Sequence, residues 1–108
     1  MRRGEVWWVD FAGGVGGEIR KTRPAVIVSS DASNRYLNRL QVVPLTSRVQ
    51  KLYPSEAYVT LSGRQHKALA DQLTTVSRQR VERLMGDLSR ADMASIESAI
   101  RTQLDLGS

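Results

Sequence analysis

The chain has 108 residues, with 16 Lys and Arg against 11 Asp and Glu, and no cysteine. This length suits one domain over residues 1–108, and the lack of cysteine excludes a disulfide framework or a thiolate metal site. Since a lone histidine, His66, cannot hold zinc by itself, we expect neither a metal nor a cofactor. The charged N-terminus lacks the apolar core of a signal peptide, and no apolar run approaches the ~18 residues of a membrane span. We therefore predict a cytoplasmic protein without membrane contact.

The first predicted elements are two strands joined by a glycine-rich loop. Residues 5–11, EVWWVDF, have the valine and aromatic content of a strand. Trp7 and Trp8 lie on opposite faces of this strand. We predict that one face packs into the core and the other forms an interface, and the alternative is that the two rings stack on bases. Residues 12–22 carry four of the glycines but lack a Gly-Lys-Ser/Thr, so a flexible lid explains them better than a phosphate-binding loop. The apolar run 25–28 predicts a strand buried on both faces.

The middle of the chain predicts short elements of both kinds. The first is a short helix over 31–38, with Ser30 or Asp31 as its N-cap, followed by an apolar strand over 40–45. A half-exposed strand over 56–61 then leads into a turn over 62–67 and one or two strands over 68–76. A capped helical turn over 77–83 and a last strand over 84–88 complete this part of the chain. His66 falls in the predicted turn, without a serine or carboxylate partner. We therefore expect it to be solvated rather than catalytic.

A helix closes the chain. Ser89 with Asp92 three residues later forms a capping box, and Gly107 is the predicted end of the helix. Apolar residues recur at spacings of three and four, which makes one stripe: Met93, Ile96, Ile100 and Leu104. Five to seven short strands with one terminal helix predict a mainly β protein, a small and strongly bent barrel.

Arg23 is the first candidate for chemistry. Pro24 holds it extended at the start of the buried strand, which would preorganise the guanidinium for a phosphate. The alternative is a local salt bridge at the strand end. Thr46 and Ser47 directly follow the second apolar strand. They would converge with Arg23 if the two strands paired in parallel or crossed, but an ordinary turn is the alternative.

Charge distribution suggests a polyanion as partner. Residues 1–81 hold 13 basic and 6 acidic side chains, whereas residues 82–108 hold 3 and 5. An arginine beside hydroxyl donors suits the charge on a pentavalent phosphate. RNA carries its own nucleophile, the 2′-hydroxyl, so a protein that cleaves RNA needs a proton acceptor, a proton donor and a cation. Glu18 is a possible acceptor.

Four motifs in order support a more specific interpretation. The series GEVWWVDF, GGE-x₄-RPAVIVS, VVPLTS and ALADQ closely resembles the MazF/PemK (Kid) toxins of bacterial toxin–antitoxin pairs, from Arg3 to Leu106. The resemblance implies an SH3-like barrel and a homodimer. It also implies a metal-independent endoribonuclease that cuts single-stranded RNA at short sequences, leaving a 2′,3′-cyclic phosphate and a 5′-hydroxyl.

The resemblance also implies roles for individual residues. Arg23 matches the catalytic arginine of the family, and Thr46 matches the threonine that stabilises the transition state. Ser47 is the neighbour of Thr46, and Glu18 matches the loop glutamate. Asp71 and Gln72 match a segment that lines the RNA groove. The sequence itself predicts a cationic groove formed by Arg20, Lys21, Arg23, Arg48 and Lys51, and Tyr53 of the loop over 49–55 is a further candidate for substrate binding. The first loop departs from the family, with Ala12-Gly13 for the usual Asp-Pro and Gly16-Gly17-Glu18 for Gly-Ser-Glu.

Two further functions and one partner follow from the same resemblance. A CcdB-like gyrase-binding toxin shares the barrel, but that family depends on a C-terminal Trp-Gly-Ile, whereas this chain ends Leu-Asp-Leu-Gly-Ser. A third possibility is a barrel that binds RNA without cleaving it, and only an activity assay can distinguish it from the endoribonuclease. The expected partner is a cognate antitoxin with an acidic, initially disordered segment, which would compete with RNA for the cationic groove.

Overall fold

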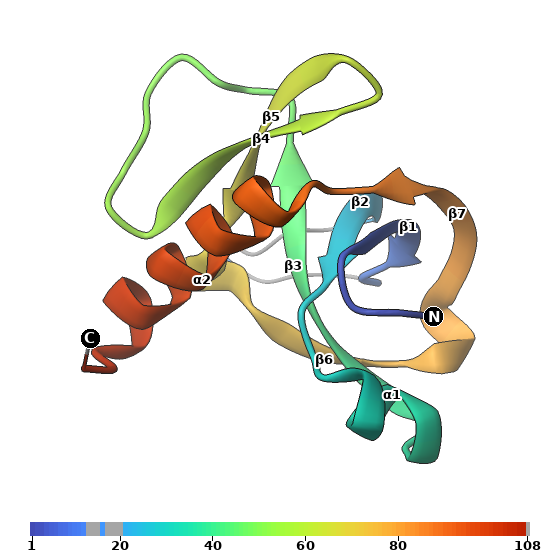
Figure 1. Cartoon of the computed structure of the whole chain (residues 1–108). Helices are drawn as coiled ribbons and strands as arrows, with labels where there is room; N and C mark the ends of the chain where they lie inside the picture. Colours follow the sequence, from blue (N-terminus) through green and yellow to red (C-terminus); the bar gives the residue numbers. More distant parts are fainter. Residues whose placement is uncertain (13–15, 17–20, 108) are drawn as a thin grey trace.

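The computed structural model describes residues 1–12, 16 and 21–107 (Figure 1). The strands are β1 (Glu5–Asp10), β2 (Thr22–Ile27), β3 (Arg39–Thr46), β4 (Glu56–Leu61), β5 (Arg64–Leu69), β6 (Thr74–Ser77) and β7 (Val81–Asp87). The helices are α1 (Asp31–Tyr36) and α2 (Arg90–Leu104), with the single turns η1 (Ala70–Gln72) and η2 (Arg78–Arg80). Within this described part of the chain, no helix is long and apolar enough to cross a membrane.

All seven strands belong to one antiparallel sheet, which curls into a half-barrel. The strand order is β4-β5-β3-β2-β1-β7, and β6 pairs with the first half of β3. β3 is the centre of the sheet because it pairs with β2 on one side and with β6 and then β5 on the other. Helix α2 packs across β4 on one face of the sheet, and α1 lies at the opposite end of β3 from the β4–β5 hairpin (Figure 1). The prediction of a mainly β fold with a C-terminal helix is confirmed.

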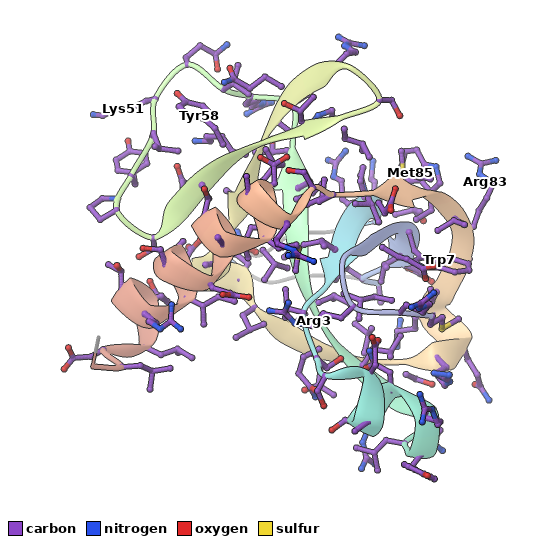
Figure 2. The ribbon with its side chains drawn as sticks, viewed as in Figure 1. Arg3, Trp7, Lys51, Tyr58, Arg83 and Met85 are labelled. Carbon is purple, nitrogen blue, oxygen red and sulfur yellow. The ribbon has the colours of Figure 1, made fainter. Side chains whose placement is uncertain are left out.

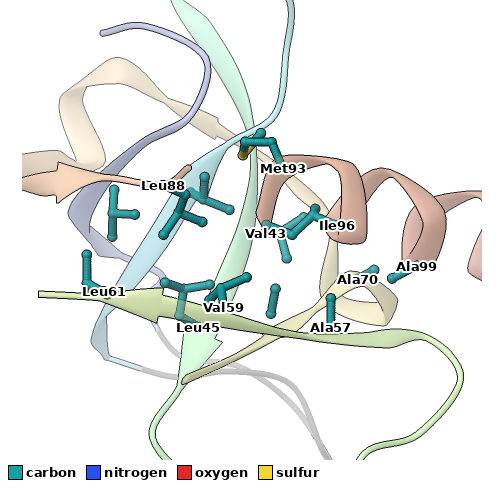
Figure 3. Close-up of a cluster of buried hydrophobic side chains, with 13 residues drawn as sticks. Val43, Leu45, Ala57, Val59, Leu61, Ala70, Leu88, Met93, Ile96 and Ala99 are labelled. Carbon is teal, nitrogen blue, oxygen red and sulfur yellow. The ribbon is translucent and has the colours of Figure 1, made fainter. Parts of the chain in front are cut away.

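The curled sheet has an apolar cluster on each side. Figure 3 shows the first cluster, in which Met93 and Ile96 of α2 meet Val43 of β3. The second cluster contains Val9 and Ile27, with Trp7 and Phe11 packed against it. Since successive residues of β2 contribute to different clusters, the strand is buried on both sides, as its uninterrupted apolar run predicts. In β1, Val6 belongs to the first cluster, whereas Val9, with Trp7 and Phe11, belongs to the second. The predicted interface on one face of β1 stays a prediction.

Both helices begin at serine caps, as the sequence predicts. Ser30 Oγ accepts a hydrogen bond from the Ser33 N–H at 3.2 Å, and Ser89 Oγ accepts one from the Asp92 N–H at 3.0 Å. The Asp92 carboxylate accepts from the Thr60 N–H of β4 at 2.9 Å. Asp92 therefore ties the helix start to the sheet instead of completing a reciprocal capping box.

Several predicted boundaries are wrong. The helical turn predicted over 77–83 is only η2, and the last strand, β7, begins at Val81 rather than at residue 84. Two further differences have a clear backbone cause. The turn predicted over residues 62–67 is only the pair Ser62-Gly63, with φ angles of 52° and 77°. Two left-handed residues make a tight hairpin turn whose twist matches that of the flanking strands, so β5 begins at Arg64. The last helix ends before Gly107, because Asp105 adopts the left-handed conformation and the Leu106 N–H bonds back to the Arg101 carbonyl.

The α2 cap gives a first test of this account of the fold. Ser89→Ala should lower the free energy of unfolding by about 1 kcal/mol, because it leaves the Asp92 N–H without its acceptor. Thermal unfolding followed by circular dichroism should show a decrease of ~4 °C. The matched control is Ser95→Ala, whose hydroxyl only donates to the Ala91 carbonyl within the same helix. An equal loss in both variants would contradict the capping role.

Candidate active-site cleft

The pairing of β2 with β3 places Arg23 and Thr46 at the same edge of the sheet. The two strands run antiparallel, with Ala25 opposite Pro44. Extending this register by two residues puts Arg23, near the start of β2, opposite Thr46, at the end of β3. We expected convergence through parallel or crossing strands; that geometry is wrong, but the antiparallel ladder brings the same side chains together.

A cleft of about 520 Å³ opens at this edge. Its lining includes four predicted site residues: Arg23, Thr46, Ser47 and Arg48. It also includes Trp8, Pro24, Leu45, His66 and Met85. The elements that contribute to it are therefore β1, β2, β3, β5 and β7, together with the segment just after β3. The convergence of so many segments on one opening makes this cleft the candidate functional site.

Arg23 and Thr46 offer complementary donors to an anion. Arg23 is exposed, and within the described part of the chain no residue forms an ion pair or hydrogen bond with its guanidinium. The alternative of a local salt bridge therefore has no support among these residues. Thr46 Oγ1 accepts the Arg48 N–H at 3.2 Å, which is the turn predicted as the other alternative. Because Oγ1 acts there as acceptor, its own proton remains available to a ligand.

Five lining residues are outside the predicted site, among them Trp8, His66 and Met85. Trp8, for which base stacking was the alternative to a core or interface position, is half-buried and lines the cleft. The Arg83 guanidinium of β7 lies over the Trp8 ring, 5.8 Å from its centroid, and Figure 2 shows Arg83 and Met85 on this strand. His66 was assigned to a solvated turn, but it is a half-buried residue of β5. The left-handed tendency of Ser62-Gly63 was the available signal that the strand begins earlier.

The loop over residues 47–55 is fastened to the sheet by a buried ion pair. Lys67 Nζ donates to Glu56 Oε1 at 2.7 Å and to the Lys51 carbonyl at 2.5 Å. These two charged side chains are only 9% and 12% exposed. Glu56 Oε1 also accepts the Tyr53 N–H at 3.0 Å, and the Tyr58 hydroxyl donates to the Val49 carbonyl at 2.8 Å. The loop that follows Thr46 and Ser47 is thus held at several points along its length.

Lys51 and Tyr53 belong to this loop but do not line the cleft. The Lys51 ammonium lies 5.0 Å from the centroid of the exposed Tyr53 ring, and the Lys67 ammonium lies 5.7 Å from it. An aromatic ring beside exposed positive charge suits the contact of a nucleic acid strand outside the cleft.

The remaining predicted site residues lie elsewhere. Asp71 and Gln72 form η1, after β5, and are not among the cleft residues. Lys21 is exposed, and its backbone closes the base of the glycine-rich loop through hydrogen bonds with Phe11 and Ala12. Glu18 and Arg20, like most of the predicted lid, fall outside the described residues. Within the described ranges, no three His, Asp or Glu side chains gather into a possible metal site.

These features define a class of protein: a curled β half-barrel with one packed helix and a cleft lined by cations and hydroxyls. Residues 2–104 match the model of the PemK-like, MazF-like toxins of type II toxin–antitoxin systems, and the chain belongs to this family. The family predicted from the four sequence motifs is therefore confirmed.

Individual relatives agree with this assignment. The chain is 39% identical to the endoribonuclease MazF9 of Mycobacterium tuberculosis, over 100% of this chain and 99% of that protein. One similar solved structure is an endoribonuclease from a mycobacterial species in complex with its cognate antitoxin. Its TM-score is 0.84 at 26% identity, and the match covers 100% of this chain and 98% of that one. MazF from Deinococcus radiodurans has a TM-score of 0.86 at 25% identity, over 98% of this chain and 97% of that one.

The ion pair beneath the loop can be tested by removing one partner. Lys67→Met should lower the free energy of unfolding by about 3 kcal/mol, because it leaves the Glu56 carboxylate buried without its counterion. It should also speed amide hydrogen exchange in residues 49–54. The matched control is Lys51→Met, an exposed lysine whose loss should change stability by less than ~0.5 kcal/mol. Unchanged exchange in the Lys67 variant would show that the pair does not hold the loop.

Proposed function

We propose that this chain is a toxin endoribonuclease that cleaves single-stranded RNA in the cleft at the paired ends of β2 and β3. In this proposal the 2′-hydroxyl of the RNA attacks the adjacent phosphate, and the products carry a 2′,3′-cyclic phosphate and a 5′-hydroxyl. The observation that carries the proposal is the placement of Arg23 and Thr46 at one edge of the sheet, in one cleft. The name of the mycobacterial relative, an endoribonuclease, supports the same activity.

Three lining residues have a chemical role in this mechanism. As the 2′-oxygen attacks, negative charge grows on the two non-bridging phosphate oxygens. The Arg23 guanidinium can donate two parallel N–H bonds to these oxygens. Thr46 can donate its hydroxyl proton to the same phosphate, and Ser47 stands beside it as a second donor. Donors that are held in place before the reaction stabilise the transition state without having to reorganise.

Affinity for the strand would come from charges outside the reacting phosphate. Arg48 lines the cleft, while Lys51 and Tyr53 extend the basic surface along the fastened loop. We assign Arg20 and Lys21, from the first loop, to the same role, and Asp71 and Gln72 to contacts outside the cleft. Glu18 remains a proposed proton acceptor from the sequence motif. Binding through phosphate contacts should weaken as salt concentration rises.

The proposal includes the organisation of the toxin in the cell. We infer a homodimer in the cytoplasm, formed of one domain over residues 1–108 and neutralised by a cognate antitoxin. The antitoxin complex of the mycobacterial structural relative supports this inference. A CcdB-like gyrase-binding role is disfavoured by the cleft, because a toxin that only binds a protein has no need for a guanidinium and hydroxyls in one cleft.

Arg23→Ala separates an enzyme from a non-catalytic RNA-binding barrel. The cleavage rate on a long single-stranded transcript, measured in EDTA, should fall by about 10²–10³-fold, because one transition-state donor is lost. Thr46→Ala should have a milder effect, since Ser47 can replace its donor in part. The matched control is Arg35→Ala, an exposed arginine of α1 at the far end of β3. If wild-type protein binds the transcript but leaves it uncut, the chain is a binding barrel.

Competition between RNA and antitoxin provides a second test. The acidic segment of the antitoxin should release a labelled, uncleaved RNA from the Arg23→Ala protein, because both ligands are polyanions that would occupy one cationic surface. Fluorescence anisotropy of the RNA measures the release, and a neutral peptide of the same length is the control. A stable ternary complex would show that the antitoxin inhibits from a separate surface.

A further inference from the structure

His66 stands in the cleft because the preceding hairpin turn is so short. β5 begins at Arg64, directly after Ser62-Gly63, and His66 is its third residue. β5 pairs with the end of β3, with Thr46 opposite Lys67, so His66 lies one residue beyond this pair and next to Ser47 in register. Lys67 reaches the buried ion pair with Glu56, and the adjacent His66 lines the cleft together with Arg23 and Thr46.

One hydrogen bond defines the tautomer of the His66 ring. Its Nδ1 lies 3.2 Å from the backbone carbonyl oxygen of Arg64. A carbonyl oxygen can only accept, so Nδ1 carries the proton and donates. In the neutral ring the other nitrogen, Nε2, is then an acceptor with a free lone pair. The strand backbone thus holds the imidazole in its proton-accepting form.

The other side chains lining the cleft cannot take a proton near neutral pH. Arg23 and Arg48 are already cationic and lose their protons only in strong base. Thr46 and Ser47 are hydroxyl donors, and Trp8 and Met85 have no basic site for this purpose. Among the described residues that line the cleft, His66 is therefore the one side chain whose neutral form offers a basic nitrogen lone pair.

We propose that His66 Nε2 is the proton acceptor for the attacking 2′-hydroxyl, an inference that rests on the proposed RNA cleavage. The proton moves from the 2′-oxygen to Nε2 as the 2′-oxygen–phosphorus bond forms. The bond between phosphorus and the 5′-oxygen breaks, and the 5′-oxygen keeps the electron pair and takes a proton from water. The imidazolium then returns its proton to solvent. Glu18 is not needed as the acceptor in this scheme.

A pH–rate profile distinguishes a proton acceptor from a residue that only positions RNA. Single-turnover cleavage of a labelled transcript by wild-type protein should rise with pH through one inflection and then level off, because the acceptor must be unprotonated. His66→Gln should be about 10²-fold slower at neutral pH and should lack this inflection. The other charged residues that line the cleft with His66 are Arg23 of β2 and Arg48 after β3.

Chemical rescue and binding complete the test. Added imidazole should restore cleavage to His66→Ala but not to Arg23→Ala. Both His66 variants should bind a 2′-O-methylated transcript, which cannot be cut, as tightly as wild type. The matched control is Gln65→Ala, the exposed neighbour on β5, which should leave the rate unchanged.

The outcomes separate this inference from the proposed function. If wild-type protein cleaves the transcript and a folded His66→Gln retains its rate within threefold and its inflection, the assignment of His66 falls while the endoribonuclease stands. A His66 variant that is slow only because it binds RNA weakly would also overturn the assignment. If wild-type protein leaves the RNA intact, the proposed function itself fails.

Discussion

The antiparallel ladder between β2 and β3 is the constraint on which the rest of the site depends. Each strand has a buried apolar run, and a polar residue stands where the strand meets the cleft: Arg23 near the start of β2 and Thr46 at the end of β3. A one-residue slip would move core side chains to the wrong face, so burial fixes the register. The energy that fixes the core therefore also fixes the separation of the two functional groups.

β3 connects this constraint to the remainder of the cleft. On its other side it pairs with β5, which supplies His66 to the opening and Lys67 to the ion pair under the loop. Adjacent residues of one short strand thus serve chemistry and structure through the simple alternation of its faces. A buried Lys–Glu pair is costly to break, so it holds the loop after Thr46 in place beside the cleft.

The cleft explains how a small protein without cysteine and with one histidine can act on RNA. RNA contributes the nucleophile, so the protein has only to bind the phosphate, stabilise the developing charge and move protons. Arg23 and Thr46 suit the first two tasks, and the imidazole of His66, with its Nδ1 proton held by a backbone carbonyl, suits the third. The +5 charge provides long-range attraction for the strand.

Local patterns in the sequence determined much of this protein. The apolar run 25–28 predicted a doubly buried strand, Ser30 and Ser89 predicted the helix starts, and the order of four motifs predicted the family. The tertiary structure decided which ends meet. The sequence pattern of β2 and of β3 is the same whether the two strands pair in parallel or antiparallel, because pairing is a contact between segments distant in sequence. Trp8 and His66 joined the cleft for the same reason: the position of a side chain on a curled sheet depends on the neighbours of its strand, which the strand's own residues do not specify.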